Sequence, residues 1–286
     1  MSKGVLLFAY NNQSVDYLKQ AVYCAKRIKE FLNLDVAVCT DNIPYLKKTY
    51  PFYKNYITHV IEASIPETKQ TRVFYDGSMA NRTLPWKNHN RSDCYEVSPF
   101  DETIVMDTDI IVSNDKLLEC FNYNEDFLIY KTIHDINPDR PDKEEYLRIS
   151  DRSIDMYWAT IFYFKKTDET KFYFDLVKHI RENWHYYRLI YQIPTKNFRN
   201  DFAFSIAIHI LNGFTKQHWP KQPPGNLWFT TDRDVLHQYK DEKFYILLDK
   251  KHWMGHYTIN TVKDCNLHLM NKFSLNRHID KEFVNE

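Results

Sequence analysis

The chain has 286 residues, of which 43% are hydrophobic and 27% are charged, a composition typical of a folded globular protein rather than a disordered one. Lysine plus arginine and aspartate plus glutamate both number 38, and this zero net charge argues against a protein that grips polyanions over its whole surface. Only 5 glycines are present, and neither the dinucleotide fingerprint nor the P-loop pattern occurs, which excludes a glycine-rich phosphate loop.

The cysteines and the apolar segments indicate where in the cell the protein resides. The 5 cysteines are scattered, and no pair has the spacing of a zinc site. An odd number of scattered thiols is typical of a reduced intracellular protein. The first apolar run is too short for a signal peptide, and no stretch reaches the length of a membrane span. We therefore expect a cytoplasmic protein without a membrane partner.

The first forty residues predict a strand, a helix and a second strand. Val5–Ala9 is an apolar strand, Ser14 is a good helix N-cap before apolar residues at helical spacing, and Asp35–Thr40 is a second apolar strand. Such a unit has a right-handed crossover. Ligands of open α/β sheets bind beyond the carboxyl ends of the strands, so residues 8–12 and 40–42 are expected at one rim.

Two carboxylates interrupt the apolar stretch between residues 101 and 114. Thr103–Met106 predicts a buried strand, Ile110–Val112 resumes the apolar run, and Asp107 and Asp109 lie between them. Side chains at i and i+2 of an extended strand point the same way, so the two carboxylates can converge on one cation. Oxygen ligands suit Mg²⁺ or Mn²⁺. The alternative is a turn with two solvated aspartates.

The rest of the chain alternates strands, helices and polar loops. Residues 69–94 are polar and predict a long loop, which is commonly functional. Asp201 lies at or near the N-cap of an apolar helix, where a carboxylate is stabilised by free backbone amides. The predicted elements are strands at Phe127–Tyr130 and Ile154–Phe164 and helices at Lys171–Tyr187 and Phe202–Leu211.

The segment SPFDETIVMDTDIIV resembles the Asp-x-Asp motif of GT-A-fold glycosyltransferases. The resemblance implies an α/β fold with a mixed sheet flanked by helices. It implies a single domain, with residues 1–114 as the nucleotide-sugar half and residues 115–286 as the acceptor-side half. The implied activity is transfer of a sugar from a nucleotide-diphosphate sugar, foremost a UDP-sugar, to a hydroxyl group, with Mn²⁺ or Mg²⁺ held against the diphosphate.

The resemblance also assigns candidate site residues. It implies metal ligation by Asp107, Asp109 and His268, with His252 as the alternative histidine, and a catalytic role for Asp201. Each assignment has a structural alternative, such as turn chemistry for the loop residues and helix capping for Asp201. The implied donor-binding residues are Ala9, Tyr10, Asn11, Tyr17, Asp41, Arg91, Asp107, Thr108 and Lys272.

The acceptor and two rival functions remain open from the sequence. The acceptors left open are a sugar or glycan, a protein, and a hydroxymethylated base of phage DNA. The phosphates of DNA could meet the basic residues of 69–91 and 178–199. A nucleotidyltransferase on a similar sheet is disfavoured because no glycine-rich loop follows the first strand. A catalytically inactive nucleotide-sugar-binding module is disfavoured by the presence of Asp107, Asp109 and Asp201.

Overall fold

The computed structural model describes residues 1–63, 70–87, 90–140, 147–150, 153–250 and 256–283. Its largest sheet has six strands in the order β3-β2-β1-β6-β10-β8. The first four are parallel, whereas β10 is antiparallel to both β6 and β8. The strands are β1 (Lys3–Ala9), β2 (Asp35–Thr40), β3 (His59–Glu62), β6 (Glu102–Met106), β8 (Phe127–Tyr130) and β10 (Trp158–Lys165).

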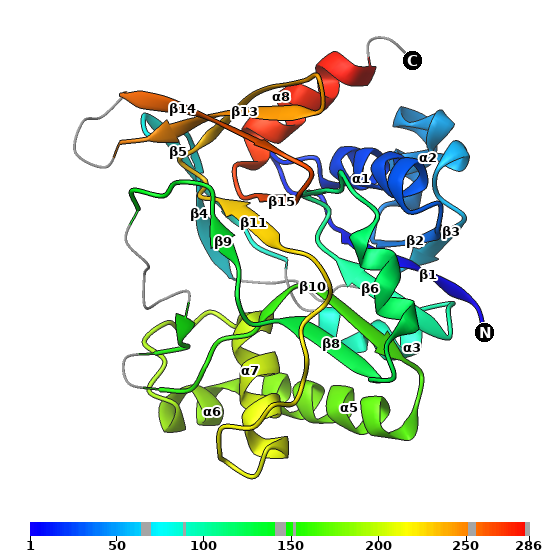
Figure 1. Ribbon diagram of the computed structural model, residues 1–286, viewed down its shortest axis with the longest axis vertical. Helices are drawn as coiled ribbons and strands as arrows, with labels where there is room; N and C mark the ends of the chain where they lie inside the picture. Colours follow the sequence, from blue (N-terminus) through cyan, green and yellow to red (C-terminus); the bar gives the residue numbers. More distant parts are fainter. Residues whose placement is uncertain (64–69, 88–89, 141–146, 151–152, 251–255, 284–286) are drawn as a thin grey trace.

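Helices flank this sheet on both sides (Figure 1). Strands covered on both faces are continuous apolar runs, and all five residues of β6 are buried accordingly. The predicted α/β fold with a mixed sheet flanked by helices is confirmed. The helices are α1 (Tyr17–Phe31) and α2 (Ile43–Thr49) on one side, and α3 (Cys94–Val97), α5 (Asp168–Glu182), α6 (Trp184–Ile190) and α7 (Asn200–Leu211) on the other.

Smaller sheets complete the structure beside the carboxyl edge of β1 and β6. A four-stranded sheet has the order β7-β15-β11-β9, and a three-stranded sheet has the order β12-β13-β14. Strands β4 and β5 form a separate hairpin. The bounds are β4 (Thr71–Asp76), β5 (Ala80–Pro85), β7 (Ile110–Ile111), β9 (His134–Asp135), β11 (Leu227–Thr230), β12 (Val235–Lys240), β13 (Lys243–Asp249), β14 (Tyr257–Lys263), β15 (Asn266–Leu269) and the last helix α8 (Lys272–Phe283).

The two halves expected from the resemblance share their sheets. Strand β10, from the second half, pairs with β6 of the first half. Strand β15, near the end of the chain, pairs with β7 of the first half. The main core is correspondingly continuous across the two halves. Its largest buried side chains include an aromatic group between strands β8 and β10 and helices α5 and α7, made of Phe127, Phe162, Tyr173, Phe174 and Phe204.

The structure corrects several local predictions. Helix α1 begins at Tyr17 with Asp16 as its N-cap, not Ser14, because the Asp16 carboxylate accepts a hydrogen bond from the Lys19 amide at 2.9 Å. The predicted long loop contains the β4–β5 hairpin, in which the polar residues are exposed and only Phe74 and Leu84 are buried. The predicted helix over 171–187 is two helices, α5 and α6, separated at Asn183.

Two further element boundaries differ from prediction. The strand expected from Ile154 begins at Trp158. Helix α7 begins at Asn200 and not at Phe202, and Asp201 lies in its first turn, near the N-cap Arg199 as predicted. All 5 cysteines are buried with free thiols. Among the described residues, none of the helices combines the length and hydropathy needed to cross a bilayer.

Candidate active site

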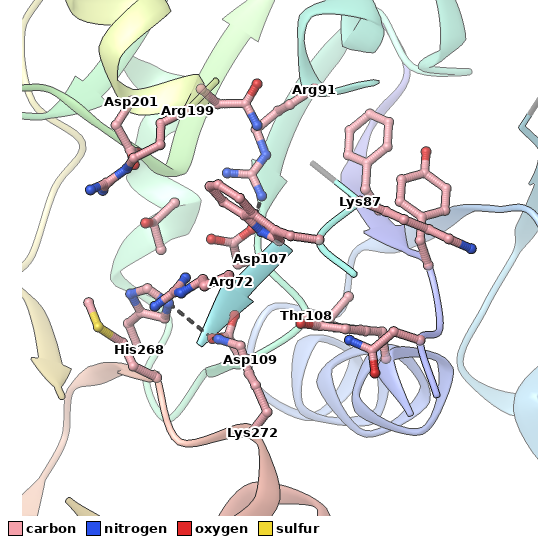
Figure 2. A pocket seen from close by; sticks show the side chains of 18 of the residues that line it. Arg72, Lys87, Arg91, Asp107, Thr108, Asp109, Arg199, Asp201, His268 and Lys272 are labelled. Carbon is pink, nitrogen blue, oxygen red and sulfur yellow. Dashed lines mark hydrogen bonds and ion pairs between the residues drawn. The ribbon is translucent and has the colours of Figure 1, made fainter. Parts of the chain in front are cut away.

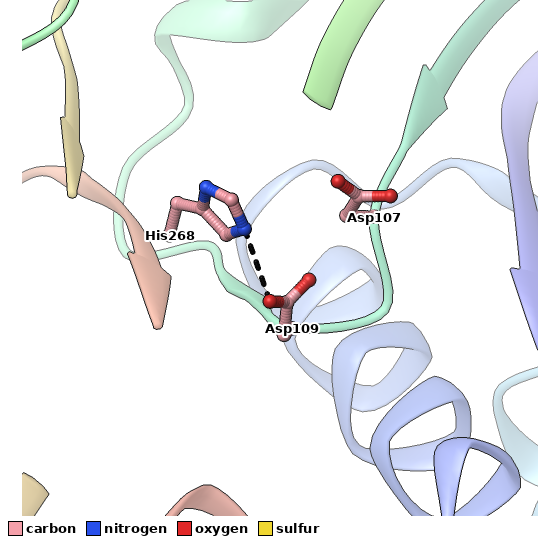
Figure 3. A group of neighbouring side chains, drawn as sticks. All are labelled: Asp107, Asp109 and His268. Carbon is pink, nitrogen blue, oxygen red and sulfur yellow. Dashed lines mark ion pairs between the residues drawn. The ribbon is translucent and has the colours of Figure 1, made fainter. Parts of the chain in front are cut away.

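Asp107, Thr108 and Asp109 form a turn where β6 reaches the carboxyl edge of the sheet. The Asp107 amide donates to the Thr160 carbonyl of β10 at 2.9 Å, and the Ile110 amide donates back to the Asp107 carbonyl at 3.2 Å. The expected extended strand is therefore a turn at this point. The turn nevertheless brings both carboxylates to the same side (Figure 3).

Strand pairing brings a histidine from the far end of the sequence to this turn. His268 of β15 is paired with Ile110 of β7, and the Leu269 amide donates to the Asp109 carbonyl at 3.0 Å. His268 Nε2 lies 3.0 Å from Asp109 Oδ2. One ligand atom from each of Asp107, Asp109 and His268 can be chosen so that all three lie within 4.8 Å of one another (Figure 3). The alternative histidine, His252, lies outside the described residues.

The chemistry of this cluster fits a divalent metal ion. Burial lowers the pKa of His268 to about 3, so its imidazole is neutral near pH 7 and carries a lone pair for ligation. Its Nδ1 atom is buried without a hydrogen-bond partner in the part of the chain that the structure describes. Two carboxylate oxygens and one imidazole nitrogen suit Mn²⁺, and the carboxylates also suit Mg²⁺.

Two largely buried cationic side chains each contact one of these carboxylates. Arg91 forms an ion pair with Asp107, and Lys272 forms one with Asp109. Burial lowers the pKa values of both cations. Buried carboxylates need such partners, because an unpaired buried charge costs several kcal/mol. The arrangement therefore places two positive groups beside the candidate cation site, where they can also contact an anionic ligand.

These groups line a pocket of about 460 Å³ (Figure 2). Asp107, Thr108, Asp109, His268 and Lys272 contribute to one part of the lining. Further positive groups come from Arg72 of the β4–β5 hairpin, Lys87, Arg91 and Arg199. A pocket with several cations around a carboxylate cluster can hold a metal together with a polyanionic ligand.

The structure brings only part of the predicted donor set into this pocket. Tyr10 and Tyr17 line it, and burial raises the pKa of Tyr17 to about 12. Ala9 is fully buried in β1 and is not part of the lining. Asn11 accepts from the Leu18 amide at 2.9 Å and donates to Asp16, so it supports the start of α1. Asp41 accepts from Lys87 at 2.7 Å outside the lining.

Sequence reasoning did not select several residues that line the pocket. Arg72 and Trp86 come from the hairpin region, and their side chains are close enough for a cation–π contact, with the guanidinium 5.8 Å from the ring centroid. Asn12 lines the pocket in place of Asn11. The β-prone run Val73–Tyr75 could have indicated a strand, but residues 71–76 do not alternate polar and apolar side chains, and only Phe74 of this strand is buried.

Asp201 lies in the same pocket, and its carboxylate is already engaged. Its Oδ1 accepts from the Ala159 amide of β10 at 3.0 Å, and its Oδ2 accepts from Arg199 at 2.9 Å. In Figure 2, Asp201 and Arg199 lie apart from the group formed by His268, Asp109 and Lys272. The pocket thus holds carboxylates in two places. Asp107 and Asp109 lie beside Arg91 and Lys272, and Asp201 lies beside Arg199.

Comparison with known proteins gives a likeness of fold at low sequence identity. No family model and no curated protein matches the chain. The structure is similar to the glycosyltransferase GlyE of Streptococcus pneumoniae (10% identity, TM-score 0.39), covering 74% of this chain and 43% of that one. It is also similar to the galactosyltransferase LgtC in complex with donor and acceptor sugar analogs (12% identity, TM-score 0.41; 74% and 70% covered).

A third similar structure is mouse xyloside xylosyltransferase 1 in its apo form (11% identity, TM-score 0.43), with 74% of this chain and 83% of that chain covered. This chain spans less than half of the length of GlyE. Superpositions of this extent do not assign an activity to the chain.

Proposed function

We propose that the protein is a metal-dependent glycosyltransferase that moves a sugar from a nucleotide-diphosphate sugar to a hydroxyl group. The observation that carries the proposal is the cluster of Asp107, Asp109 and His268 beside Lys272. A divalent cation held there supplies charge neutralisation of the leaving diphosphate. The resemblance of the Asp-x-Asp segment to the GT-A motif supports the same activity.

The donor is expected to lie along the pocket with its diphosphate beside the metal ligands. Lys272 and Arg91 are positioned to offset negative charge on the phosphates, and Arg72 adds a third positive group from the hairpin. Tyr10 and Tyr17 offer aromatic surfaces for the base at the β1 side of the pocket. We propose a UDP-sugar as the donor and Mn²⁺ or Mg²⁺ as the ion.

Asp201 is proposed to act at the sugar end of the pocket. Both of its oxygens accept hydrogen bonds, from the Ala159 amide and from Arg199. A carboxylate held from both sides keeps a fixed orientation, which suits it to bind the donor sugar or to stabilise positive charge that develops on it. Removal of the acceptor proton by the same carboxylate would require it to exchange its bond from Arg199.

The acceptor is proposed to be a hydroxyl group of a small molecule or a glycan. A DNA acceptor finds less support, because three of the five Lys and Arg residues of 178–199 are paired with acids in the structure. Lys178 and Arg181 both contact Asp93, and Arg199 contacts Asp201. The five buried free thiols support a cytoplasmic location, because thiols persist in a reducing compartment.

The experiment is a thermal-shift panel of UDP, GDP, CDP and ADP, each with and without Mn²⁺. A ligand that binds only the native state raises apparent stability by mass action, so one diphosphate should raise Tm only when Mn²⁺ is present. Asp109→Asn should abolish this shift and the hydrolysis of the matching nucleotide sugar. Asp175→Asn is the matched control, because Asp175 is exposed on α5 and pairs with Lys171 away from the pocket. No metal-dependent shift with any diphosphate would refute the proposal.

A further inference from the structure

Arg72 reaches the pocket from the first strand of the β4–β5 hairpin. Its guanidinium lies 5.6 Å from the ring centroid of Phe74 and 5.8 Å from that of Trp86. Both rings belong to a small apolar cluster that also contains Leu84 of β5. Aromatic rings attract a cation placed over their faces, so they hold the guanidinium without neutralising its charge. The hairpin therefore presents a positioned positive group to the pocket.

The guanidinium of Arg72 lies close to the candidate metal cluster. Burial lowers the pKa values of His268 and Lys272, and the positive charge of Arg72 lowers both further. Figure 2 shows Arg72 beside His268. The preceding residue, Thr71, accepts a hydrogen bond at its carbonyl from the Asn197 side chain at 2.9 Å. Arg72 is thus placed where the metal cluster meets the segment that leads into α7.

Arg72 differs from the other cations that line the pocket. Within the described parts of the chain, it forms no ion pair with a carboxylate. Burial raises the pKa of the nearby Asp232, and the charges of both Arg72 and Arg233 act on that carboxylate, so it does not neutralise Arg72 alone. Each of the other four lining cations forms an ion pair: Arg91 with Asp107, Lys272 with Asp109, Arg199 with Asp201, and Lys87 with Asp41.

Binding of a metal and a nucleotide sugar would leave Arg72 as the unmatched charge. A divalent cation balances the charges of Asp107 and Asp109. Their present partners, Arg91 and Lys272, can then pair with the two phosphates of the donor, each of which carries one negative charge. A substrate that fills the pocket also removes water from Arg72. A desolvated charge without a partner is costly, so the filled pocket needs one more anion.

We propose that Arg72 binds a second anionic group of the substrates, a carboxylate or a phosphate carried by a sugar. The inference rests on the proposed function and narrows its substrates to those that include an acidic sugar. A planar guanidinium donates two parallel hydrogen bonds to either group, which a neutral hydroxymethyl group cannot accept in the same way. Two sources supply this chemistry. One is an acceptor such as a uronic acid or a sugar phosphate, and the other is a donor whose transferred sugar is a uronic acid.

Isothermal titration calorimetry on the full chain compares ligands that differ in charge. Glucuronate and glucose 6-phosphate are compared with glucose, and galacturonate with galactose, all with Mn²⁺ and both with and without UDP. If the acceptor carries the anion, at least one acidic sugar should bind at least about tenfold more tightly than its neutral counterpart. If the transferred sugar carries it, the same preference should appear between UDP-glucuronate and UDP-glucose instead. Equal or absent binding in every pair overturns the proposal.

Variants of Arg72 assign the preference to this side chain. Arg72→Gln should reduce the ratio of acidic to neutral affinity to within about twofold, whereas Arg72→Lys should keep part of it, because the charge remains and the planar fork is lost. Arg277→Gln is the matched control, since it removes an arginine that pairs with Asp76 of the same hairpin but lies outside the pocket lining. It should keep the full ratio. A preference that survives in Arg72→Gln also overturns the proposal.

The outcome for the proposed function is read separately. That function fails if no nucleotide diphosphate shows Mn²⁺-dependent binding. The sugars are also titrated without UDP, so the comparison of acidic and neutral sugars does not depend on nucleotide binding. Mn²⁺-dependent binding of a nucleotide together with equal affinities in every acidic and neutral pair would retain the proposed function and remove the role of Arg72.

Discussion

Arg91 and Asp201 contact the two polar groups of one residue, Ala159 of β10. The Ala159 amide donates to Asp201 Oδ1 at 3.0 Å, and its carbonyl oxygen accepts a hydrogen bond from Arg91. Arg91 also forms an ion pair with Asp107. A continuous set of contacts therefore joins Asp107 of the candidate metal cluster to Asp201 at the start of α7, through strand β10, which lies between β6 and β8 in the main sheet.

Arg91→Met removes the partner of Asp107, which is only partly exposed. We expect unfolding free energy to fall by about 1–3 kcal/mol, because a desolvated carboxylate loses its counter-charge. Affinity for Mn²⁺ should stay the same or rise, since a competing cation has gone. Urea titration and calorimetry with Mn²⁺ measure the two effects. Arg277→Met is the control, because its ion pair with Asp76 is exposed and should be worth at most about 1 kcal/mol.

His268→Ala tests the nitrogen ligand of the cluster. Loss of one of three protein ligands should weaken Mn²⁺ binding by at least about tenfold, following the sensitivity of metal sites to their coordinating and supporting groups. Titration followed by electron paramagnetic resonance of free Mn²⁺ gives the affinity directly. His237→Ala, an exposed residue of β12, should leave it unchanged. Equal Mn²⁺ affinity in wild type and His268→Ala would remove His268 from the site.

Lys272→Met tests the cation beside Asp109. In the proposed reaction Lys272 meets charge that develops on the leaving diphosphate, so turnover should fall by about 10²–10³-fold. The measurement is the rate of donor hydrolysis with saturating Mn²⁺ and nucleotide sugar. Lys171→Met, which removes an exposed ion pair on α5, is the control. A turnover within about twofold of wild type would contradict a role at the phosphates.

Stability should depend on pH through His278 of α8. Burial lowers the pKa of His278 to about 4, and its Nε2 atom lies 3.2 Å from the Tyr23 hydroxyl. Between pH 4 and the usual histidine pKa of about 6.5, His278 is protonated in the unfolded chain but neutral in the folded one. The contribution of His278 to the free energy of unfolding is therefore complete above about pH 6.5 and is lost as the pH falls toward 4. At pH 5 the loss from this group should be roughly 2 kcal/mol.

The substitution His278→Gln should remove that part of the pH dependence. Denaturant titrations of both proteins at pH 7 and pH 5 give the comparison, in which the variant should lose less stability than wild type. Lys281 and Arg27 also disfavour the imidazolium, and Glu282 lies 4.0 Å from it. An unchanged loss between the two pH values would assign the acid sensitivity to other groups.

Truncation of two phenylalanines on α5 should change the free energy of unfolding by very different amounts. Phe174 is 1% exposed and packs against other rings, including Phe164 and Phe204. Phe174→Ala should cost about 3–5 kcal/mol, because the buried ring leaves a cavity. Phe172 is 62% exposed on the same helix, and Phe172→Ala should change stability by less than about 0.5 kcal/mol. Comparable losses in both variants would contradict the orientation of α5.

The parts of the fold that were predicted correctly are those with long apolar runs. The strands Asp35–Thr40 and Phe127–Tyr130 have the predicted bounds, because all of their residues except Asp35 are buried and such strands are nearly continuous apolar runs. The β4–β5 hairpin was missed for the opposite reason. It is largely exposed, so its sequence lacks the apolar alternation by which a half-buried strand is detected.

Some residues of the site are predicted by a local sequence pattern, whereas others depend on contacts between distant parts of the chain. Asp107 and Asp109 are one residue apart, and their nearness follows from the sequence itself. The position of His268 beside them depends on pairing between β15 and β7, which no local pattern specifies. It was anticipated through the family resemblance alone. Arg72 was not selected because its place in the pocket depends on how the hairpin packs.

The pairing of β15 between β7 and β11 has a consequence for the order in which the protein matures. The aspartates leave the ribosome more than 150 residues ahead of their histidine partner, since Asp109 and His268 are separated by 159 positions (268 − 109). A nascent chain that ends before β15 can already form β1, β2 and β6, but its β7 lacks the β15 partner and its carboxylates lack His268 and Lys272. Synthesis must pass residue 268 before the three-ligand cluster can close, and residue 272 before Lys272 can pair with Asp109.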